Sequence, residues 1–258
     1  MNTWLDKIER HLYGVKAGVM VEGQELSGLL PDEVQMVVEE LAIKNQALRQ
    51  EPGLDKDTGK VIPPKPGKII DVEATVEKIL AAEEYACIEL EEVLIQTEYS
   101  AEDLEQANQP LGYYETWIGG TFSRHTNISL AAQGINNIVV WPKEPFSFNE
   151  VVGPRSVERG YLPAPIILMG SRENDFGGGV CQVSSTLYNA VLKAGLQVIE
   201  RHPHSRRVAY VPAGMDAAVD YGSLDFKFAN NLEEPIIVKA GTSQGKVWVK
   251  ILGREKRG

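Results

Sequence analysis

Cysteine and histidine are scarce in this chain. Its 258 residues include two cysteines, Cys87 and Cys181, and four histidines. Two cysteines exclude a small scaffold held together by several disulfides. The scarcity directs attention to residues 177–205, because this one stretch holds Cys181 together with two of the four histidines.

Long apolar runs are also missing. No run approaches the roughly 18 apolar residues that a membrane-spanning helix requires. The first residues lack the apolar core and the small-residue cleavage site of a signal peptide. They place Trp4, Leu5, Ile8 and Leu12 on one face instead, which predicts an amphipathic helix over 1–14. Taken literally, the chain carries no export signal.

The chain has no concentrated basic stripe either. The formal net charge is −10, with 10 Lys and Arg against 23 Asp and Glu in residues 1–110, and 16 against 13 in residues 111–258. Binding to phosphate backbones needs clustered Lys and Arg, so we exclude nucleic acid as a partner. The uneven charge predicts two units with different surfaces.

The first part of the chain alternates between short strand signals and helix signals. Gly and Pro separate the elements, and Ser or Asp precedes two of the helices as N-cap residues. The predicted elements are a hairpin over 17–26, a helix from Pro31, a loop over 50–68 with a hairpin near 57–59, a helix over 72–83 capped by Asp71, a strand over 86–97 and a helix over 100–107 capped by Ser100.

A boundary signal near 108–113 precedes a second part that is richer in strands. We predict strands at 116–122, 137–141, 165–168, 196–201, 206–211, 218–229, 235–240 and 246–252, a weak helix at 126–135 and a strong one at 182–194. The expected fold class is α+β. It combines a small N-terminal α/β module with a mostly antiparallel β domain, in which one buried helix bears Cys181.

Three consecutive glycines, Gly177, Gly178 and Gly179, precede the strong helix. Glycine allows positive φ and a close approach of the backbone to another group. Cys181 therefore lies at the N-terminus of the helix, where the unpaired N–H groups and the helix dipole favour a thiolate. The same N–H groups can stabilise an oxyanion, so Cys181 is a candidate nucleophile.

A nucleophilic cysteine needs a base, and the tripeptide containing His202 and His204 follows the next predicted strand. A cysteine on a helix with a histidine at the end of a later strand is the general layout of papain-like thiol enzymes. We take Asp216 as the third catalytic candidate, although the sequence does not choose among several orienting groups. These groups are Asp216, Asp220, Asp225 and Asn127.

Other interpretations of these residues stay open. The glycine turn is also suited to binding an anion or to tight packing, and a buried cysteine is often a small hydrophobe. Cys181, His202 and His204 would make a workable zinc set, but the spacing lacks a metal signature, and no metal or cofactor is expected. The candidate ligand-binding residues are Gly177, Gly178, Gly179, Gln182, Ser184, Arg124, Asn127, Asn149 and Tyr210.

The segment 177–205 closely resembles the signature of the VanW family, which is named after an accessory protein of B-type vancomycin-resistance clusters. The resemblance extends over about residues 117–253. It includes the segments 124–128, 146–155, 160–161, 210–217 and 225–231. The family implies a role in the bacterial cell envelope and in vancomycin resistance, and it implies a VanW-like domain over 113–253.

Residues 15–108 resemble the peptidoglycan-binding module found beside many L,D-transpeptidases and VanW domains. The resemblance rests on Leu26-Ser27-Gly28 before a helix start and on 67–71 before a second helix. It implies that peptidoglycan or its stem peptides, and other envelope proteins, are partners. Because the chain shows no signal peptide, a cytoplasmic location is the alternative to an envelope location.

Two hypotheses about function follow. In the first, Cys181 and a histidine carry out acyl transfer or peptidase-like hydrolysis on peptidoglycan peptides. In the second, the protein is a non-catalytic module that binds peptidoglycan or a partner. The resemblance names a family but no reaction, so the sequence leaves both open, with the Cys/His metal site as a third.

Overall fold

The computed structural model describes residues 4–168 and 171–254 and divides the chain into two compact units. Unit 1 comprises Met1–Glu51 and Pro64–Tyr99, and unit 2 comprises Pro52–Pro63 and Ser100–Gly258. Each unit has its own hydrophobic core. The α+β fold class predicted from the sequence is confirmed.

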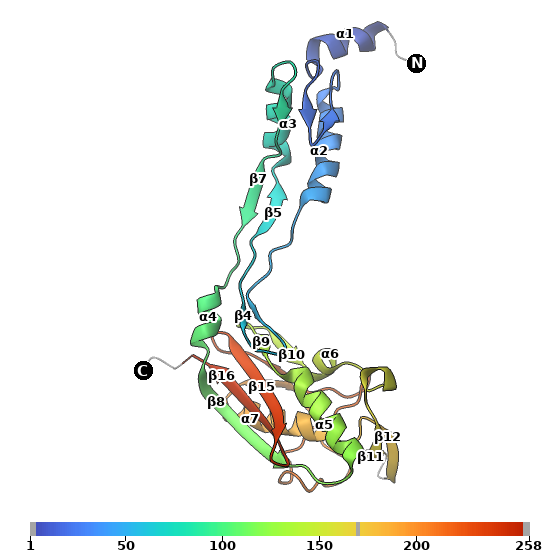
Figure 1. Ribbon diagram of the computed structural model, residues 1–258, viewed down its shortest axis with the longest axis vertical. Coiled ribbons are helices and arrows are strands. Elements are labelled where there is room, and N and C mark those ends of the chain that lie inside the picture. The colour runs from blue at the N-terminus through green and yellow to red at the C-terminus, as the bar shows by residue number, and fades with distance from the viewer. Residues whose placement is uncertain (1–3, 169–170, 255–258) are drawn as a thin grey trace. The chain divides into compact units, whose positions relative to one another are not determined.

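Unit 1 is built from three helices and two small sheets (Figure 1). Strand β1 pairs antiparallel with β2 and parallel with β6, while β5 pairs antiparallel with β7. The elements are α1 (Trp4–Tyr13), β1 (Met20–Val21), β2 (Gln24–Glu25), α2 (Pro31–Asn45), β5 (Gly67–Ile70), α3 (Val72–Ala81), β6 (Cys87–Ile88) and β7 (Glu92–Ile95).

Local signals explain the helices of unit 1. Asp71 caps α3 by accepting a bond from the Ala74 N–H at 2.9 Å, as predicted. Apolar residues at helical spacing on α2 and α3 meet in the core, where Val34, Val38 and Ile79 are fully buried. The amphipathic N-terminal helix is confirmed as α1, but none of its described residues is buried.

Unit 2 contains one four-stranded antiparallel sheet of order β8-β16-β15-β9, a three-stranded antiparallel sheet of order β10-β14-β13, and two hairpins. Its elements are β3 (Gly53–Leu54), β4 (Val61–Ile62), α4 (Ala101–Gln106), β8 (Gln109–Trp117), α5 (Phe122–Ile135), β9 (Ile138–Val140), β10 (Pro145–Ser147), α6 (Phe148–Val152), a 3₁₀ turn (Val157–Arg159), β11 (Pro163–Leu168), β12 (Ser171–Phe176), α7 (Val180–Lys193), β13 (Gln197–Glu200), β14 (Lys227–Ala229), β15 (Ile236–Ser243) and β16 (Lys246–Gly253).

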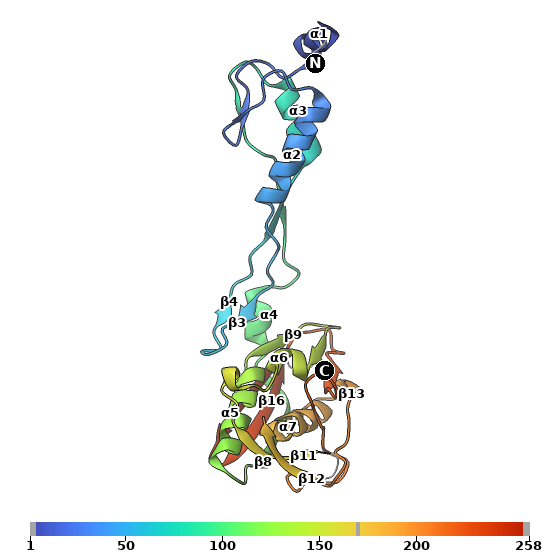
Figure 2. The ribbon, with the colours of Figure 1, turned by 90° about the vertical axis from the view of Figure 1, so that its right-hand side faces the viewer.

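Two helices, α5 and α7, pack together and against the four-stranded sheet (Figure 2). Val183, Leu187 and Val191 of α7 are fully buried at the predicted helical spacing. Helix α5 buries Ile128, Ala131, Ala132 and Ile135 as completely. The sequence indicated one buried helix in this domain, and the structure adds α5 as a second.

The hairpin β3–β4 belongs to unit 2. It confirms the hairpin predicted within the loop 50–68. Asn137 donates to the carbonyls of Asp55 and Lys56 at 3.2 and 2.8 Å, and the Lys56 ammonium donates to the carbonyl of Gly134. These bonds hold the hairpin to the end of α5. Strand β8 runs through 109–113, where the sequence indicates a boundary.

Several predicted strands of unit 2 are wrong. Residues 206–211 form no strand, and within 218–229 only β14 is one, apart from isolated bridges. Helix α5 starts at Phe122 because Thr121 caps it, so the end of the predicted strand 116–122 is replaced by helix. Strands β10 and β12 and helix α6 were not predicted.

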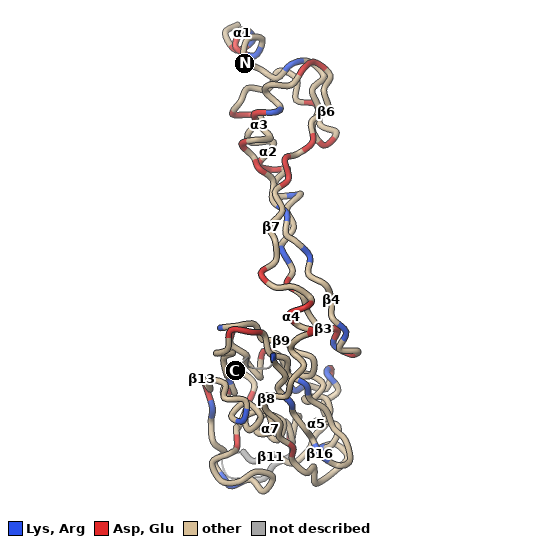
Figure 3. Tube along the Cα trace, turned by 90° about the vertical axis from the view of Figure 1, so that its left-hand side faces the viewer, with Lys and Arg blue, Asp and Glu red and all other residues tan. Residues whose placement is uncertain are grey.

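The negative charge of the chain resides in unit 1. Residues 1–51 and 64–99 hold 18 Asp and Glu against 8 Lys and Arg, whereas the rest of the chain holds 18 of each (Figure 3). Unit 2 therefore has no formal net charge, so its individual charged side chains do not act against a net charge of the whole unit. None of the described helices combines the length and apolar composition needed to cross a bilayer.

Candidate functional site

The glycine turn brings the start of α7 against strand β11. Gly179 is the N-cap with φ of 111°, and Gly177 has φ of 82°, both in the left-handed region that favours glycine. A Cβ on Gly178 would lie 2.5 Å from the carbonyl oxygen of Ala164. The three glycines therefore serve close packing and backbone geometry.

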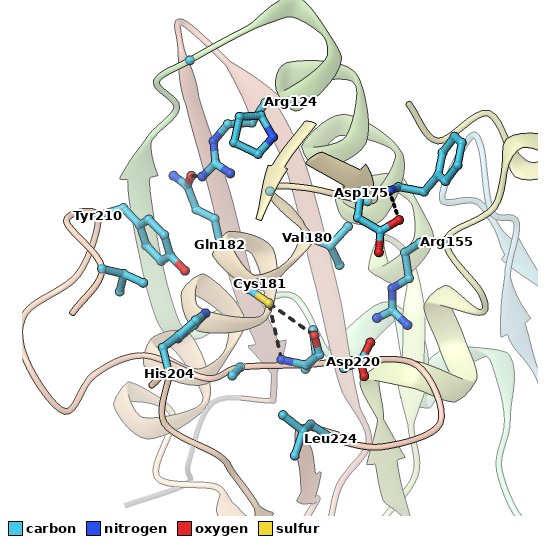
Figure 4. A pocket seen from close by; sticks show the side chains of 18 of the residues that line it. Arg124, Arg155, Asp175, Val180, Cys181, Gln182, His204, Tyr210, Asp220 and Leu224 are labelled. Atoms are coloured by element: carbon cyan, nitrogen blue, oxygen red, sulfur yellow. Dashed lines mark hydrogen bonds between the residues drawn. The ribbon is translucent and has the colours of Figure 1, made fainter. Parts of the chain in front are cut away.

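Cys181 lies in the first turn of α7 and lines a cavity of about 1000 Å³ (Figure 4). Its thiol is half-buried and donates to the carbonyl of Val219 at 3.3 Å, while the Val219 N–H lies 3.5 Å from the sulfur. Both cysteines are free thiols. The thiol thus faces a cavity large enough for a peptide-sized ligand.

His204 and Asp216 lie beside Cys181. The His204 ring points toward the sulfur in Figure 4, and its Nδ1 lies 2.6 Å from Asp216 Oδ2. Burial opposes the charged form of His204, but interactions with Cys181 and then with Asp216 outweigh it and raise the pKa of His204. Cys181, His204 and Asp216 thus lie in the order thiol, imidazole and carboxylate, which is the order that a nucleophile, its base and an orienting acid require.

Asp216 is held in place by two further donors. Burial works against its charge, but bonds from the backbone N–H and ring of His204 prevail and lower the pKa of Asp216. Arg201 adds a bond to Asp216 Oδ1 at 2.9 Å and stacks over Tyr188. The sequence did not single out Arg201, although it directly precedes His202 at the end of β13.

Side chains of α7 fix the segment that carries Asp216. Ser184 donates to the carbonyl of Ala217 at 2.6 Å, and Ser185 accepts from the Ala217 N–H at 2.9 Å. Asn189 donates to the carbonyl of Met215 at 2.7 Å. Ser184 is a candidate ligand-binding residue on the basis of the sequence, but it is fully buried, and its hydroxyl helps to tether this segment to α7.

His202 is not among the residues that line the cavity of Cys181. Its Nε2 is 2.9 Å from Glu200 Oε1, and Glu200 also pairs with Lys227. Bonds from Lys227 and then His202 lower the pKa of Glu200 to about 2. Cys181, His202 and His204 do not converge, and no group of three or more His, Cys, Asp or Glu among the described residues is placed to hold a metal.

Gln182 connects the start of α7 to Arg124. Its amide nitrogen donates to Thr116 Oγ1 at 2.9 Å and to the Trp117 carbonyl at 2.8 Å. Its oxygen accepts from Arg124 at 2.6 Å, and Arg124 Nε donates to the Gly119 carbonyl at 3.0 Å. Both line the cavity, where burial lowers the pKa of Arg124.

The predicted ligand residues Asn127 and Asn149 serve as backbone clamps. Asn127, fully buried on α5, donates to the carbonyls of Leu162 and Gly178 and accepts from the Leu162 N–H. Asn149 donates to the carbonyls of Asp220 and Leu224 at 3.1 and 2.8 Å. Neither is among the lining residues of the cavity.

Tyr210 and Arg155 complete the lining. Tyr210, which the sequence suggests as a candidate ligand-binding residue, lines the cavity beside His204, with ring centroids 6.5 Å apart, and burial raises the pKa of its hydroxyl. Arg155 was not selected from the sequence, although it ends the motif 146–155. The sequence signal for Arg155 is its position directly after Gly153 and Pro154. A sequence does not show whether the side chain of such an arginine points into a cavity.

This arrangement is suited to attack by a thiolate on a carbonyl. In such an attack Cys181 would supply the sulfur, His204 would accept the proton, and Asp216 would orient the ring. In the first turn of α7 the N–H groups of Val180 and Gln182 bond to the carbonyls of Gly177 and Gly179. The Cys181 N–H between them is the described first-turn donor nearest the sulfur.

Comparison with known proteins matches unit 2 to a family. The family described as VanW like protein matches residues 123–252. The uncharacterised protein YoaR of Bacillus subtilis (strain 168) is 42% identical over 200 residues, which are 76% of this chain and 66% of that protein. The vancomycin B-type resistance protein VanW of Enterococcus faecalis (strain ATCC 700802 / V583) is 30% identical over 112 residues, 42% of this chain and 41% of that protein.

The chain thus spans slightly less than two thirds of the first relative and less than half of the second. No solved structure matches it significantly. The matched region of the family contains Cys181, His204, Asp216 and the whole cavity except Gly119 and Gly120.

Proposed function

The chain belongs to the VanW family, and from this premise we propose that unit 2 is a cysteine-dependent acyl-transfer enzyme of the cell envelope acting on peptidoglycan stem peptides. One observation carries the proposal. Cys181, at the start of α7, faces a cavity beside His204, whose other ring nitrogen is bonded to a nearly buried Asp216. Such a chain of contacts activates a thiol at neutral pH.

The first step transfers the thiol proton to His204. The bond to Asp216 occupies Nδ1, which leaves Nε2 for Cys181 and stabilises the imidazolium that forms. The thiolate then attacks the substrate carbonyl carbon, a C–S bond forms, and the carbonyl electrons move to oxygen. The Cys181 N–H at the start of α7 and the helix dipole favour that negative charge, whereas the neighbouring N–H groups of Val180 and Gln182 are already bonded to backbone carbonyls.

Collapse of this adduct breaks the C–N bond. His204 returns its proton to the leaving amine, and a thioester with Cys181 remains. Water, deprotonated by His204, hydrolyses the thioester in a peptidase reaction, whereas an amine from a second peptide would give transpeptidation. In either case the free thiol is restored and the atoms balance without a cofactor.

Two resemblances support the proposed substrate class. One relative is named a vancomycin B-type resistance protein, and we propose that this chain likewise acts on the cell wall. The sequence resemblance of residues 15–108, most of which lie in unit 1, to the module found beside L,D-transpeptidases is the second support. We propose that unit 1 binds the wall and that the protein works at the envelope. Its excess of acidic residues disfavours non-specific adsorption to anionic wall polymers.

The first test is alkylation by iodoacetamide at pH 6.5, followed by peptide mass spectrometry. Cys87 is exposed and serves as the reference thiol within the same molecule. We expect Cys181 to react at least about tenfold faster than Cys87, because helix N-termini and a neighbouring histidine favour the thiolate. His204→Gln should slow Cys181 by about tenfold, to roughly the rate of Cys87, because the neighbouring base that favours its thiolate is lost.

His202→Gln is the matched control, since its ring is bonded to Glu200 and not to the site. Equal rates at Cys181 and Cys87 in the parent protein would refute the proposal of an activated nucleophile.

The second test incubates the protein with isolated muropeptides and looks for new masses by mass spectrometry. Products that persist in Cys181→Ser would assign the reaction to another residue, and a fully retained resistance phenotype in that variant would favour a binding module.

A further inference from the structure

Arg155 carries a buried charge without a hydrogen-bond partner. Its two terminal nitrogens are inaccessible to solvent, and no described residue accepts a hydrogen bond from either. The guanidinium lies over the rings of Phe148 and Tyr221, 5.7 and 5.8 Å from their centroids. The rings hold the group in position, but they leave its donors unsatisfied, which is costly for a buried cation.

The glycine turn before Cys181 also seats Arg155. A Cβ on Gly177 would lie 2.7 Å from both Cβ and Cγ of Arg155, so a side chain at this position would displace the arginine stem. Figure 4 shows Arg155 and Cys181 in the same cavity with Val180 near both. The turn therefore positions the nucleophile and the cation together.

The other charges of the cavity are already occupied or exposed. Arg124 is bonded to Gln182 and Gly119. Asp220 accepts from the Ser223 hydroxyl, and Asp175 accepts from the Phe176 N–H. The charged lining residues are Arg124, Arg155, Arg207, Asp175 and Asp220, with His204 as a titrating group. Arg155 is thus the described cation of this lining whose terminal nitrogens have no hydrogen-bond acceptor, although the carboxylates of Asp220 and Asp225 lie near enough to act on its charge through space.

We propose that Arg155 binds a free carboxylate of the substrate, so that the pocket takes a peptide whose carboxyl end lies next to the carbonyl that Cys181 attacks. The proposal rests on the proposed function and names its substrate class. A guanidinium presents two parallel N–H donors that match a carboxylate. The reaction would then remove or exchange the last residue of a peptide and leave internal bonds intact.

Two alkylating agents of similar size separate this proposal from the activity of the thiol. Iodoacetate carries a carboxylate one carbon from the reacting centre, and iodoacetamide carries a neutral amide there. The measured quantity is the ratio of their rate constants at Cys181, divided by the same ratio at Cys87. Each substitution of sulfur for iodide releases iodide and leaves a thioether, so both reagents report on the same thiolate.

We expect Arg155→Gln to lower this ratio about tenfold, because a bidentate charge-assisted pair is lost. Arg155→Lys keeps the charge and should lower it less. Arg207→Gln, which removes one charge from an exposed lining residue, should leave the ratio within about twofold. The iodoacetamide rate and the circular dichroism spectrum report whether each variant keeps its fold.

Equal ratios in the parent protein and in Arg155→Gln would overturn the proposal. So would equal losses in Arg155→Gln and Arg207→Gln, because that result would mean a general field and no binding. If Cys181 reacts no faster than Cys87 with iodoacetamide, the proposed enzyme fails, yet the ratio still reports on carboxylate binding. The two failures are therefore distinguishable.

Discussion

At the scale of single residues, Asp216 accepts hydrogen bonds from several donors at once. It accepts from the His204 ring, the His204 N–H and Arg201. The sequence offered four orienting groups and could not rank them, because their partners lie far apart in the chain. Asp225 bonds Ser147, Asn127 clamps the glycine turn, and Asp220 bonds Ser223. Only tertiary packing separates these roles.

The pair His204–Asp216 should give unit 2 a pH window of extra stability. The pKa of His204 is raised above 6.5, so its contribution is full below pH 6.5 and is lost as pH rises through the raised value. The pKa of Asp216 is lowered below 3.8, so its contribution is present above pH 3.8 and is lost as pH falls through the lowered value.

Asp216→Asn should therefore destabilise unit 2 most between pH 3.8 and 6.5, by about 1–3 kcal/mol as expected for hydrogen bonds to a charged group. Urea unfolding followed across pH 3–9 measures this cost. Asp220→Asn is the control, because that carboxylate is exposed on the same segment. A cost for Asp216→Asn that stays constant over the whole range would refute the coupling.

Helices were more predictable than strands at the scale of elements. The apolar spacing and Gly195 predict helix α7, and the N-cap residues Asp71 and Ser100 predict α3 and α4. The predicted strand 218–229 was to begin within the segment 215–219, but backbone groups of this segment bond to Cys181, Ser184, Ser185 and Asn189 of α7, and the Ala218 N–H bonds to the His202 carbonyl. Strand propensity cannot show that a helix supplies these partners.

Gly178→Ala should destabilise unit 2 by about 1–3 kcal/mol, the usual cost of overpacking. The added Cβ would meet the Ala164 carbonyl at 2.5 Å, and neither backbone can yield without moving α7 or β11. Urea unfolding and the alkylation rate of Cys181 measure the effect. Gly119→Ala is the matched control, since no atom lies within 4 Å of its added Cβ. Equal stability of the two variants would contradict this account of the turn.

The whole molecule contains two separate cores. Ile79 belongs to the core of unit 1 and Leu187 to that of unit 2, and both are fully buried. Sequence composition suggested two parts through their charge, and the structure shows that all of the net charge lies in unit 1. Sequence could not show that the hairpin 52–63 returns to unit 2, because that depends on the distant Asn137.

Ile79→Ala and Leu187→Ala should each lower the stability of one unit by about 2–5 kcal/mol, as for other large-to-small core substitutions. Hydrogen exchange in urea, read peptide by peptide, assigns the loss to a unit. Ile79→Ala should leave the alkylation of Cys181 unchanged under native conditions. A loss of protection spread equally over both units in either variant would show that they unfold as one.

The tether between α7 and the segment 215–219 has a consequence for motion. Cys181, Ser184, Ser185 and Asn189 bind this segment along one face of the helix. When α7 rocks within unit 2, Asp216 travels with it, and the spacing between sulfur and carboxylate is preserved. Movements of the loops around the cavity would therefore leave the distance between the Cys181 sulfur and the Asp216 carboxylate unchanged.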